Sequence, residues 1–280
     1  MNARVTTGHS AWDVSDVDLV AFRQALHGMA SSIAVGHALA LLPELPPKAR
    51  SIEIGCGLGK MSALMGLAGV SPVLFDSSQA TLDEARKAFH SIDVSVECVL
   101  GDALDLPSEV IASFDLSMSW GLNEHFSGKP RQKIFDAHAE VLKENGWSII
   151  GVPCRNCISY RMAMLVWKLT GRWPKGLYEY GFDRSELARR MQQAGFKKIK
   201  VLSGTRPGDD FRHYILGNLR AVVHKFTGLF PKDKPPDIKG ATISDIRQKL
   251  LESGRPNEFL SSQSYMLIAI GQKKMINNTL

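Results

Sequence analysis

The sequence predicts an α/β fold in which a doubly wound, mostly parallel sheet carries helices on both faces. Short apolar runs alternate with helical patterns over residues 50–153, the order that produces parallel sheets. Three glycines, at positions 55, 57 and 59, directly follow the first apolar run, and acids follow the next two runs, at Asp76 and Asp102. Since ligands bind at the carboxyl ends of parallel strands, these residues mark the expected site.

The first strand, Ser51–Ile54, leads into the turn Glu-Ile-Gly-Cys-Gly-Leu-Gly at residues 53–59. Glycines at every second position let the backbone turn tightly and approach a ligand, which then meets a helix N-terminus. Glu53 narrows the choice of ligand, because a carboxylate here suits an amine or a sulfonium and repels a pyrophosphate. The turn therefore predicts a nucleotide-like ligand that carries positive charge.

Two other classes of glycine-rich loop are excluded by the spacing of their required residues. A dinucleotide fingerprint that starts at Gly55 needs glycine at residue 60, which is Lys60. A phosphate-binding P-loop needs glycine at position 54 and Ser or Thr after Lys60, but the chain has Ile54 and Met61. The turn therefore belongs to neither class.

The following elements continue the alternation. The pattern predicts strands over Pro72–Asp76, Val96–Leu100, Phe114–Ser119, Gly146–Val152 and Gln263–Gln272, and helices over 16–43, Ser77–Phe89, Ile134–Lys143 and from Asp183 to Ala194. A carboxylate at the end of the second strand, here Asp76, hydrogen-bonds ribose hydroxyls in doubly wound sheets.

The pattern [DE]-x-G-x-G-x-G at 53–59, followed in order by Asp76 and Asp102, resembles the class I S-adenosylmethionine (SAM) methyltransferases. The stretch Trp-Gly-Leu-Asn-Glu-His-Phe at 120–126 resembles the segment after strand four in small-molecule methyltransferases such as those of the quinone pathways. The resemblance covers roughly residues 50–153 and 183–203. It implies a Rossmann-like sheet of seven strands with helical lid insertions, and SAM as the cofactor.

The resemblance also implies which residues hold SAM, with the Asp after the third strand receiving the adenine amino group. These cofactor-binding candidates are Glu53, Gly55, Cys56, Gly57, Gly59, Asp76, Ser77, Asp102, Ala103 and Ser119.

Methyl transfer from a sulfonium is an in-line displacement, so alignment of donor and acceptor is the main requirement. A base is needed only if the acceptor must lose a proton. His125 is the first candidate for that base and Glu124 the alternate, since both lie on the loop expected to face the methyl group. The alternative to a catalytic role is that His125 is a structural residue at the start of a helix. Candidates for lining the acceptor pocket are Trp120, Tyr160, Tyr178 and Tyr180.

Composition and charge indicate the cellular location, the absence of a metal site and the charge of the partner. The first ten residues lack the apolar block of a signal peptide, and four Cys fit a reducing compartment, so a cytoplasmic location is expected. The pair Cys154 and Cys157 is too small a ligand set for structural zinc, and no metal site is expected. Residues 1–154 hold 11 Lys/Arg and 18 Asp/Glu, whereas residues 155–234 hold 17 and 6. Such asymmetry indicates an anionic partner.

Two basic amphipathic stretches, 158–172 and 211–226, leave three interpretations open. They are ordinary lid helices with solvated charges, peripheral contacts with an anionic membrane, or a nucleic-acid surface, although no RNA-binding module is recognisable.

The expected domains are an N-terminal helical cap (1–48), a SAM-binding core (49–203) with a lid insertion (154–182), a helical insertion (204–262), and a last strand with a tail (263–280).

The function predicted on this basis is methyl transfer from SAM to oxygen or nitrogen of a small, partly apolar acceptor, either anionic or delivered at a membrane. Two rivals stay open: a methyltransferase for RNA or protein that uses the basic 155–234 surface, and a non-catalytic SAM-binding scaffold. The sequence does not indicate an oligomeric state.

Overall fold

Seven strands form one sheet in the computed structural model of the protein, which describes residues 14, 16–169, 178–205, 241–253 and 264–275. The strand order is β3-β2-β1-β4-β5-β7-β6, in which only β7 runs antiparallel to its neighbours. The strands are β1 Arg50–Ile54, β2 Ser71–Asp76, β3 Glu97–Leu100, β4 Phe114–Trp120, β5 Leu142–Pro153, β6 Phe196–Ser203 and β7 Met266–Lys273. The predicted seven-stranded, Rossmann-like class is confirmed.

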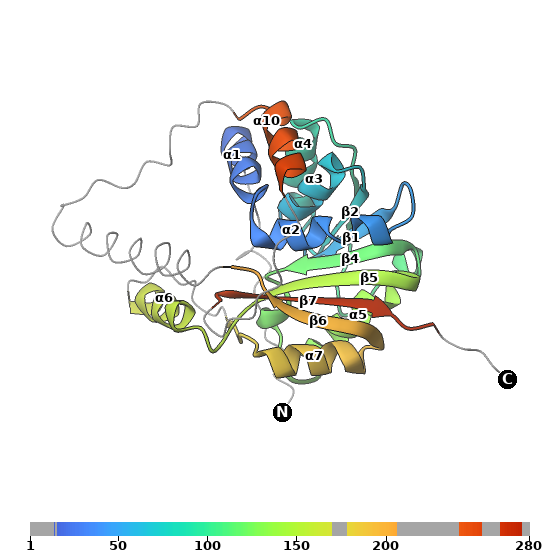
Figure 1. Cartoon of the computed structure of the whole chain (residues 1–280), viewed down its shortest axis with the longest axis vertical. Helices are drawn as coiled ribbons and strands as arrows, with labels where there is room; N and C mark the ends of the chain where they lie inside the picture. The colour runs from blue at the N-terminus through green and yellow to red at the C-terminus, as the bar shows by residue number, and fades with distance from the viewer. Residues whose placement is uncertain (1–13, 15, 170–177, 206–240, 254–263, 276–280) are drawn as a thin grey trace.

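Helices cover both faces of this sheet (Figure 1). One layer contains α1 Leu19–Met29, α2 Ile33–Leu39, α3 Lys60–Leu67, α4 Gln79–His90 and α10 Ile243–Glu252. The other contains α5 Gly128–Glu140, α6 Ile158–Leu169 and α7 Arg184–Gln193. Short 3-10 helices occur at η2 Leu42–Glu44, η3 Ser108–Val110 and η4 Asn123–His125. A separate hydrophobic core lies between the sheet and each of these two helix layers. Because side chains alternate along a strand, every strand contributes side chains to both cores.

The predicted boundaries around α5 are wrong. The helix was expected over Ile134–Lys143, but it begins six residues earlier, at Gly128, and ends at Glu140. Pro130 is tolerated there because it lies in the first turn, where its missing N–H has no helical partner. The carbonyl of Val141 accepts from the backbone N–H groups of Ser113 and Phe114, so the chain leaves the helix to pair with β4, and β5 starts at Leu142 rather than Gly146.

Part of the predicted insertion at 204–262 packs against the N-terminal helices. Helix α10 buries Ile246 and Leu250 in the same core as α1, and Lys249 Nζ donates to the carbonyl of His27 across 2.9 Å. This part therefore contains a helix of the core, while a lid role of the insertion stays a prediction. The predicted helix over 211–226 lies outside the described residues, as does Arg172 at the end of the predicted helix 158–172.

No single helix in the described part of the chain has the length and apolarity needed to cross a membrane. The stretch Leu19–Met29 with Ile33–Glu44 passes that test only as a pair, and the pair is bent by 76°.

Candidate functional site

The glycine turn between β1 and α3 adopts a conformation that side chains disfavour. Gly55, Gly57 and Gly59 have φ angles of +65°, +53° and +64°. The backbone N–H groups of Gly55 and Cys56 both donate to the carbonyl of Phe75, at 2.8 and 3.2 Å. The turn is thus fixed to the neighbouring strand β2, and Gly59 caps the start of α3.

Gly57 forms the open side of this turn. A Cβ built on Gly57 would meet no heavy atom of the described chain within 4 Å, whereas one built on Gly55 would lie 2.6 Å from Leu122 Cδ1. The backbone N–H of Gly57 donates to Asp76 Oδ2 across 3.0 Å. The backbone at Gly57 therefore borders open space beside a carboxylate, a cradle suited to a ligand.

The two predicted acids lie at the ends of neighbouring strands. Asp76 ends β2, where its Oδ1 accepts from the backbone N–H of Ser78 at 3.1 Å. The backbone N–H of Gly101 donates to the Asp76 carbonyl at 3.0 Å, which brings the exposed Asp102 to the same edge. Asp102 Oδ1 accepts from the backbone N–H of Leu104 at 2.8 Å. Because a carboxylate offers about four lone-pair sites, both acids can accept further hydrogen bonds.

Glu53 lies below the turn and is 4% exposed. Its Oε2 accepts from the backbone N–H of Ser62, in the first turn of α3, across 2.9 Å. Burial raises the pKa of Glu53 to about 7. Burial also raises the pKa of the neighbouring Cys56, whose thiol lies 3.9 Å from Asp76 Oδ2. A bound cation would favour the ionised form of Glu53.

The remaining cofactor candidates differ in accessibility. Ser77 is exposed beside Asp76, and Ala103 is half-buried beside Asp102. Ser119 is fully buried and its hydroxyl bonds Asn123 Oδ1 at 2.9 Å, so its contact with a cofactor stays a prediction.

A buried polar chain supports the end of β4. His138, on α5, bridges the hydroxyls of Ser117 and Ser119 with Nδ1 at 3.1 Å and Nε2 at 3.0 Å. Complete burial lowers the pKa of His138 to about 3, so the ring is neutral. Through Ser119 this chain reaches Asn123, the first residue of η4. The loop after β4 is therefore held from beneath.

Three polar atoms on this loop have no hydrogen-bond partner within the described residues. They are Trp120 Nε1, Asn123 Nδ2 and Glu124 Oε2. Buried polar groups in native proteins are normally paired, so these three atoms are available to hydrogen-bond a ligand or a water at this loop.

Residues 178–182, here called the strap, lie along this loop and are held by two contacts to the loop and one to helix α5. His125 Nδ1 lies 3.2 Å from the carbonyl of Tyr178, and the backbone N–H of Tyr180 donates to the carbonyl of Glu124 at 2.8 Å. Arg131 Nη2 donates to the carbonyl of Tyr180. The His125 ring also bonds the backbone of Gly121, while burial lowers its pKa. The strap thus closes one side of the site.

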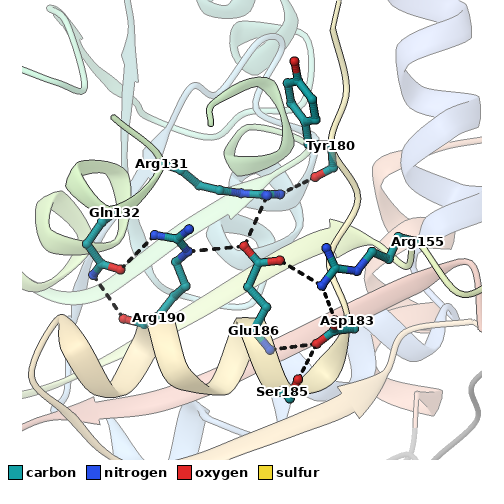
Figure 2. A network of polar contacts seen from close by, with 8 residues as sticks. All are labelled: Arg131, Gln132, Arg155, Tyr180, Asp183, Ser185, Glu186 and Arg190. Atoms are coloured by element: carbon teal, nitrogen blue, oxygen red, sulfur yellow. Dashed lines mark hydrogen bonds and ion pairs between the residues drawn. The ribbon is translucent and has the colours of Figure 1, made fainter. Parts of the chain in front are cut away.

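Figure 2 shows the ionic network that anchors the strap. The carboxylate of Glu186, on α7, meets the guanidinium groups of Arg131 at 3.2 Å, Arg155 at 3.2 Å and Arg190 at 3.4 Å. Asp183 also pairs with Arg155. Although burial of Asp183 acts to raise its pKa, hydrogen bonds, the Arg155 one first, hold that pKa below its usual range.

The predicted acceptor residues fall into two groups. Tyr160 is 5% exposed, donates to Glu179 Oε1 at 2.7 Å and packs edge-on against Tyr265. Tyr178 and Tyr180 are exposed and stack with centroids 6.5 Å apart. Trp120 packs on Gly151, where a Cβ would lie 2.2 Å from its ring. All of these line the same end of the sheet as the glycine turn, but their contact with an acceptor stays a prediction.

Sequence reasoning missed the side chains that support the loop and the strap. They are Asn123, Arg131, His138, Glu179 and Glu186. His138 falls four residues after Ile134 on the apolar stripe of α5, and a polar residue on such a stripe signals a buried hydrogen-bond network. The long-range pairs of Glu186 have no comparable local signal.

Other features of the described chain lie away from this site. A cavity of about 390 Å³ opens at the amino ends of β1, β2 and β3, the opposite edge of the sheet. Cys154 and Cys157 are buried and not disulfide-bonded. The described residues contain no group of three or more His, Cys, Asp or Glu that could hold a metal ion.

Comparisons with known proteins agree with this geometry. The family described as "Methyltransferase domain" matches residues 52–146. A ubiquinone biosynthesis O-methyltransferase of Thiobacillus denitrificans is 27% identical over 160 residues, 55% of this chain and 67% of that protein. The same-named protein of Ruegeria pomeroyi is 28% identical over 157 residues, 54% of this chain and 60% of that protein. The matches span about two thirds or less of these relatives.

Solved structures share the fold. A SAM-dependent methyltransferase of Thermotoga maritima superposes with a TM-score of 0.54 at 20% identity, covering 89% of this chain and 92% of that one. One from Archaeoglobus fulgidus has a TM-score of 0.54 at 12% identity, covering 90% and 94%. The [4+2]-cyclase SpnF reaches 0.55 at 16% identity, covering 87% and 81%. At these identities the likeness shows the fold alone.

Proposed function

We propose that this chain, which belongs to the class I SAM-dependent methyltransferases, transfers a methyl group to an oxygen of a small acceptor with an apolar body. The observation that carries the proposal is the open glycine cradle at Gly57 held against Asp76, with the orphaned polar atoms of the β4 loop opposite. The choice of oxygen rests on the matched relatives, which are described as O-methyltransferases of ubiquinone biosynthesis.

The residues at the cradle suit SAM. The backbone at Gly57 leaves room for the methionine part, Asp76 can accept from ribose hydroxyls, and Asp102 can accept from the adenine amino group. When bound, SAM supplies an electrophilic methyl group on a sulfonium. Glu53 then contributes negative charge beneath the turn, which favours a cationic ligand.

The chain's own contribution is alignment and exclusion of water. The β4 loop holds the strap through His125 and the Glu124 carbonyl, and helix α5 holds it through Arg131, which fixes the wall against which the acceptor lies. A fixed near-attack geometry supplies much of the barrier reduction in such displacements. For a hydroxyl acceptor, we assign His125 the role of the base that removes the hydroxyl proton. Burial lowers the pKa of its imidazole, so the ring is neutral at physiological pH and can accept that proton.

Helix α6 supports a second element of the proposal, peripheral contact with an anionic membrane. Its exposed face carries Ile158, Met162, Leu165 and Leu169, with Arg161 and Lys168 also exposed. An apolar stripe with basic flanks is typical of interfacial helices. Flotation with anionic vesicles should retain the wild-type chain at low salt and release a Leu165→Glu variant. Vesicle binding by that variant equal to that of wild type would remove α6 from the proposal. The proposed cytoplasmic location is tested separately, by cell fractionation.

The test of the function is incubation with methyl-labelled SAM and fractionated cell extract. Label should enter the small-molecule fraction, and at a SAM concentration near the wild-type Kd an Asp76→Ala variant should transfer at least about tenfold less. Label found only in RNA or protein would favour the macromolecular rival that uses the basic 155–234 segment. SAM binding with no transfer into any fraction would favour a scaffold.

A further inference from the structure

Glu124 lies where the donor side of the site meets the acceptor side. Two residues earlier, Leu122 reaches the glycine turn, 2.6 Å from a Cβ built on Gly55. Glu124 Oε1 lies 3.4 Å from a Cβ built on Gly121, and its backbone carbonyl accepts from the strap residue Tyr180. The loop that carries Glu124 is thus held between the turn and the strap.

The Glu124 carboxyl is buried and makes no ion pair with a described residue. The residue is 4% exposed, and Oε2 has no hydrogen-bond partner among the described residues. The cation that faces it, Arg131, makes its ion pair with Glu186 and its other hydrogen bond with the Tyr180 carbonyl. Because burial disfavours the ionised form more than the backbone hydrogen bond and the Arg131 charge favour it, the carboxyl holds its proton at neutral pH.

We propose that Glu124 is an uncharged acid that selects the acceptor by donating a hydrogen bond from its carboxyl O–H to an acceptor oxygen. The inference rests on the proposed function and assigns Glu124 a specificity role in place of the predicted role as alternate base. While it holds its proton, the carboxyl cannot act as a base, but it can donate a hydrogen bond to an oxygen lone pair. A neutral amine has a single lone pair, which attacks the methyl group, so it has none left to accept this hydrogen bond.

The groups around Glu124 set the pH range of this donor. Burial, first, and the negative charge of Glu179 raise the pKa of Glu124 to about 8, while the charge of Arg131 opposes the shift. Tyr160 bonds Glu179 and stays protonated, since burial raises its pKa further above the usual range. The proton-bound form is the active one, so acceptor KM should rise above about pH 8 while SAM affinity stays constant.

Two substitutions separate recognition from base catalysis. Glu124→Gln keeps an uncharged hydrogen-bond donor, so acceptor KM should stay within about threefold of wild type and lose its alkaline rise. Glu124→Leu removes the donor and should raise KM for a 4-alkylphenol about tenfold, with little change for the 4-alkylaniline of equal chain length. Glu140→Gln, at an exposed acid of α5, is the matched control and should change nothing.

An acceptor-independent measurement completes the test. With S-adenosylhomocysteine bound at pH 7, the infrared difference between wild type and Glu124→Gln should contain the carbonyl stretch of a protonated carboxylic acid. An ionised carboxylate in that spectrum overturns the proposal, as does a hundredfold fall of kcat in Glu124→Gln with KM unchanged. Failure of wild type to bind S-adenosylhomocysteine would instead contradict the proposed function.

Discussion

The backbone N–H of Gly57 donates a hydrogen bond to Asp76 Oδ2 across 3.0 Å, joining the glycine turn to the end of the neighbouring strand. The same carboxylate accepts from the backbone N–H of Ser78 through its other oxygen. One side chain therefore holds both the turn after β1 and the start of α4. The open face of Gly57 and the acid beside it keep a fixed relative position before any ligand binds, which reduces the cost of ordering on binding.

Gly57→Ala should weaken SAM binding at least tenfold. A methyl group at Gly57 would project into the open space of the cradle, where we place the methionine part of SAM. Gly69→Ala is the matched control, because Gly69 also has positive φ and open space around its Cβ but lies in the turn before β2. Each substitution should cost about 1 kcal/mol of folding stability through backbone strain. Calorimetry with SAM checks the difference, and equal affinities in the two variants would exclude Gly57 from the site.

His125→Asn and His125→Ala should separate the two roles of this residue. The Asn amide can still donate to the Tyr178 carbonyl, which His125 Nδ1 reaches at 3.2 Å, but it cannot act as a base. If His125 removes a proton, both variants should lose about 10²-fold or more in kcat while SAM affinity stays unchanged. A His125→Asn variant with near-normal kcat beside an inactive His125→Ala would make the histidine a structural link to the strap.

Glu186→Gln should destabilise the fold by about 3 kcal/mol. The substitution leaves the buried guanidinium of Arg131 without its anion, and removing one member of a buried pair is costly. Asp83→Asn, which breaks the exposed pair with Arg86 on α4, should cost less than about 1 kcal/mol. Urea unfolding measures both. Similar losses in the two variants would mean that the network in Figure 2 contributes no more than a surface pair.

His138 should make stability fall in acid. Burial lowers its pKa to about 3, so between about pH 6.5 and 3 the unfolded chain binds a proton that the folded chain does not. The free energy of unfolding should therefore decrease as pH falls through this range, by up to about 1.4 kcal/mol per pH unit. His138→Gln should flatten this slope, and His90→Gln, at an exposed position, should not. Identical slopes in all three proteins would refute this account of His138.

Strand positions could be read from the sequence because parallel core strands are short apolar runs bounded by Gly and Asp. The carboxyl ends of β1 and β2 were predicted at the correct residues, Ile54 and Asp76. The boundary between α5 and β5 and the placement of α10 were not, because both depend on long-range contacts, such as Val141 with Ser113 and Lys249 with His27. Local pattern carries no information about such partners.

The candidate site was predictable on its donor side and less so elsewhere. The glycine turn and the two acids form a local motif with fixed spacing, so their proximity followed from sheet topology alone. The strap, Arg131 and Glu186 come from separate stretches of the chain that tertiary packing brings together. The protonated state of Glu124 depends on burial, which no spacing in the sequence encodes.

The central claim, that SAM binds at the turn and Asp76, is tested most directly by titration calorimetry. Wild type should bind SAM, and Asp76→Ala should bind about 10 to 100 times more weakly, since hydrogen bonds to a charged group contribute about 1.5–3 kcal/mol. Asp83→Ala, at an exposed acid of the following helix, should bind normally. Absence of binding by wild type, or unchanged affinity in Asp76→Ala, would contradict the account.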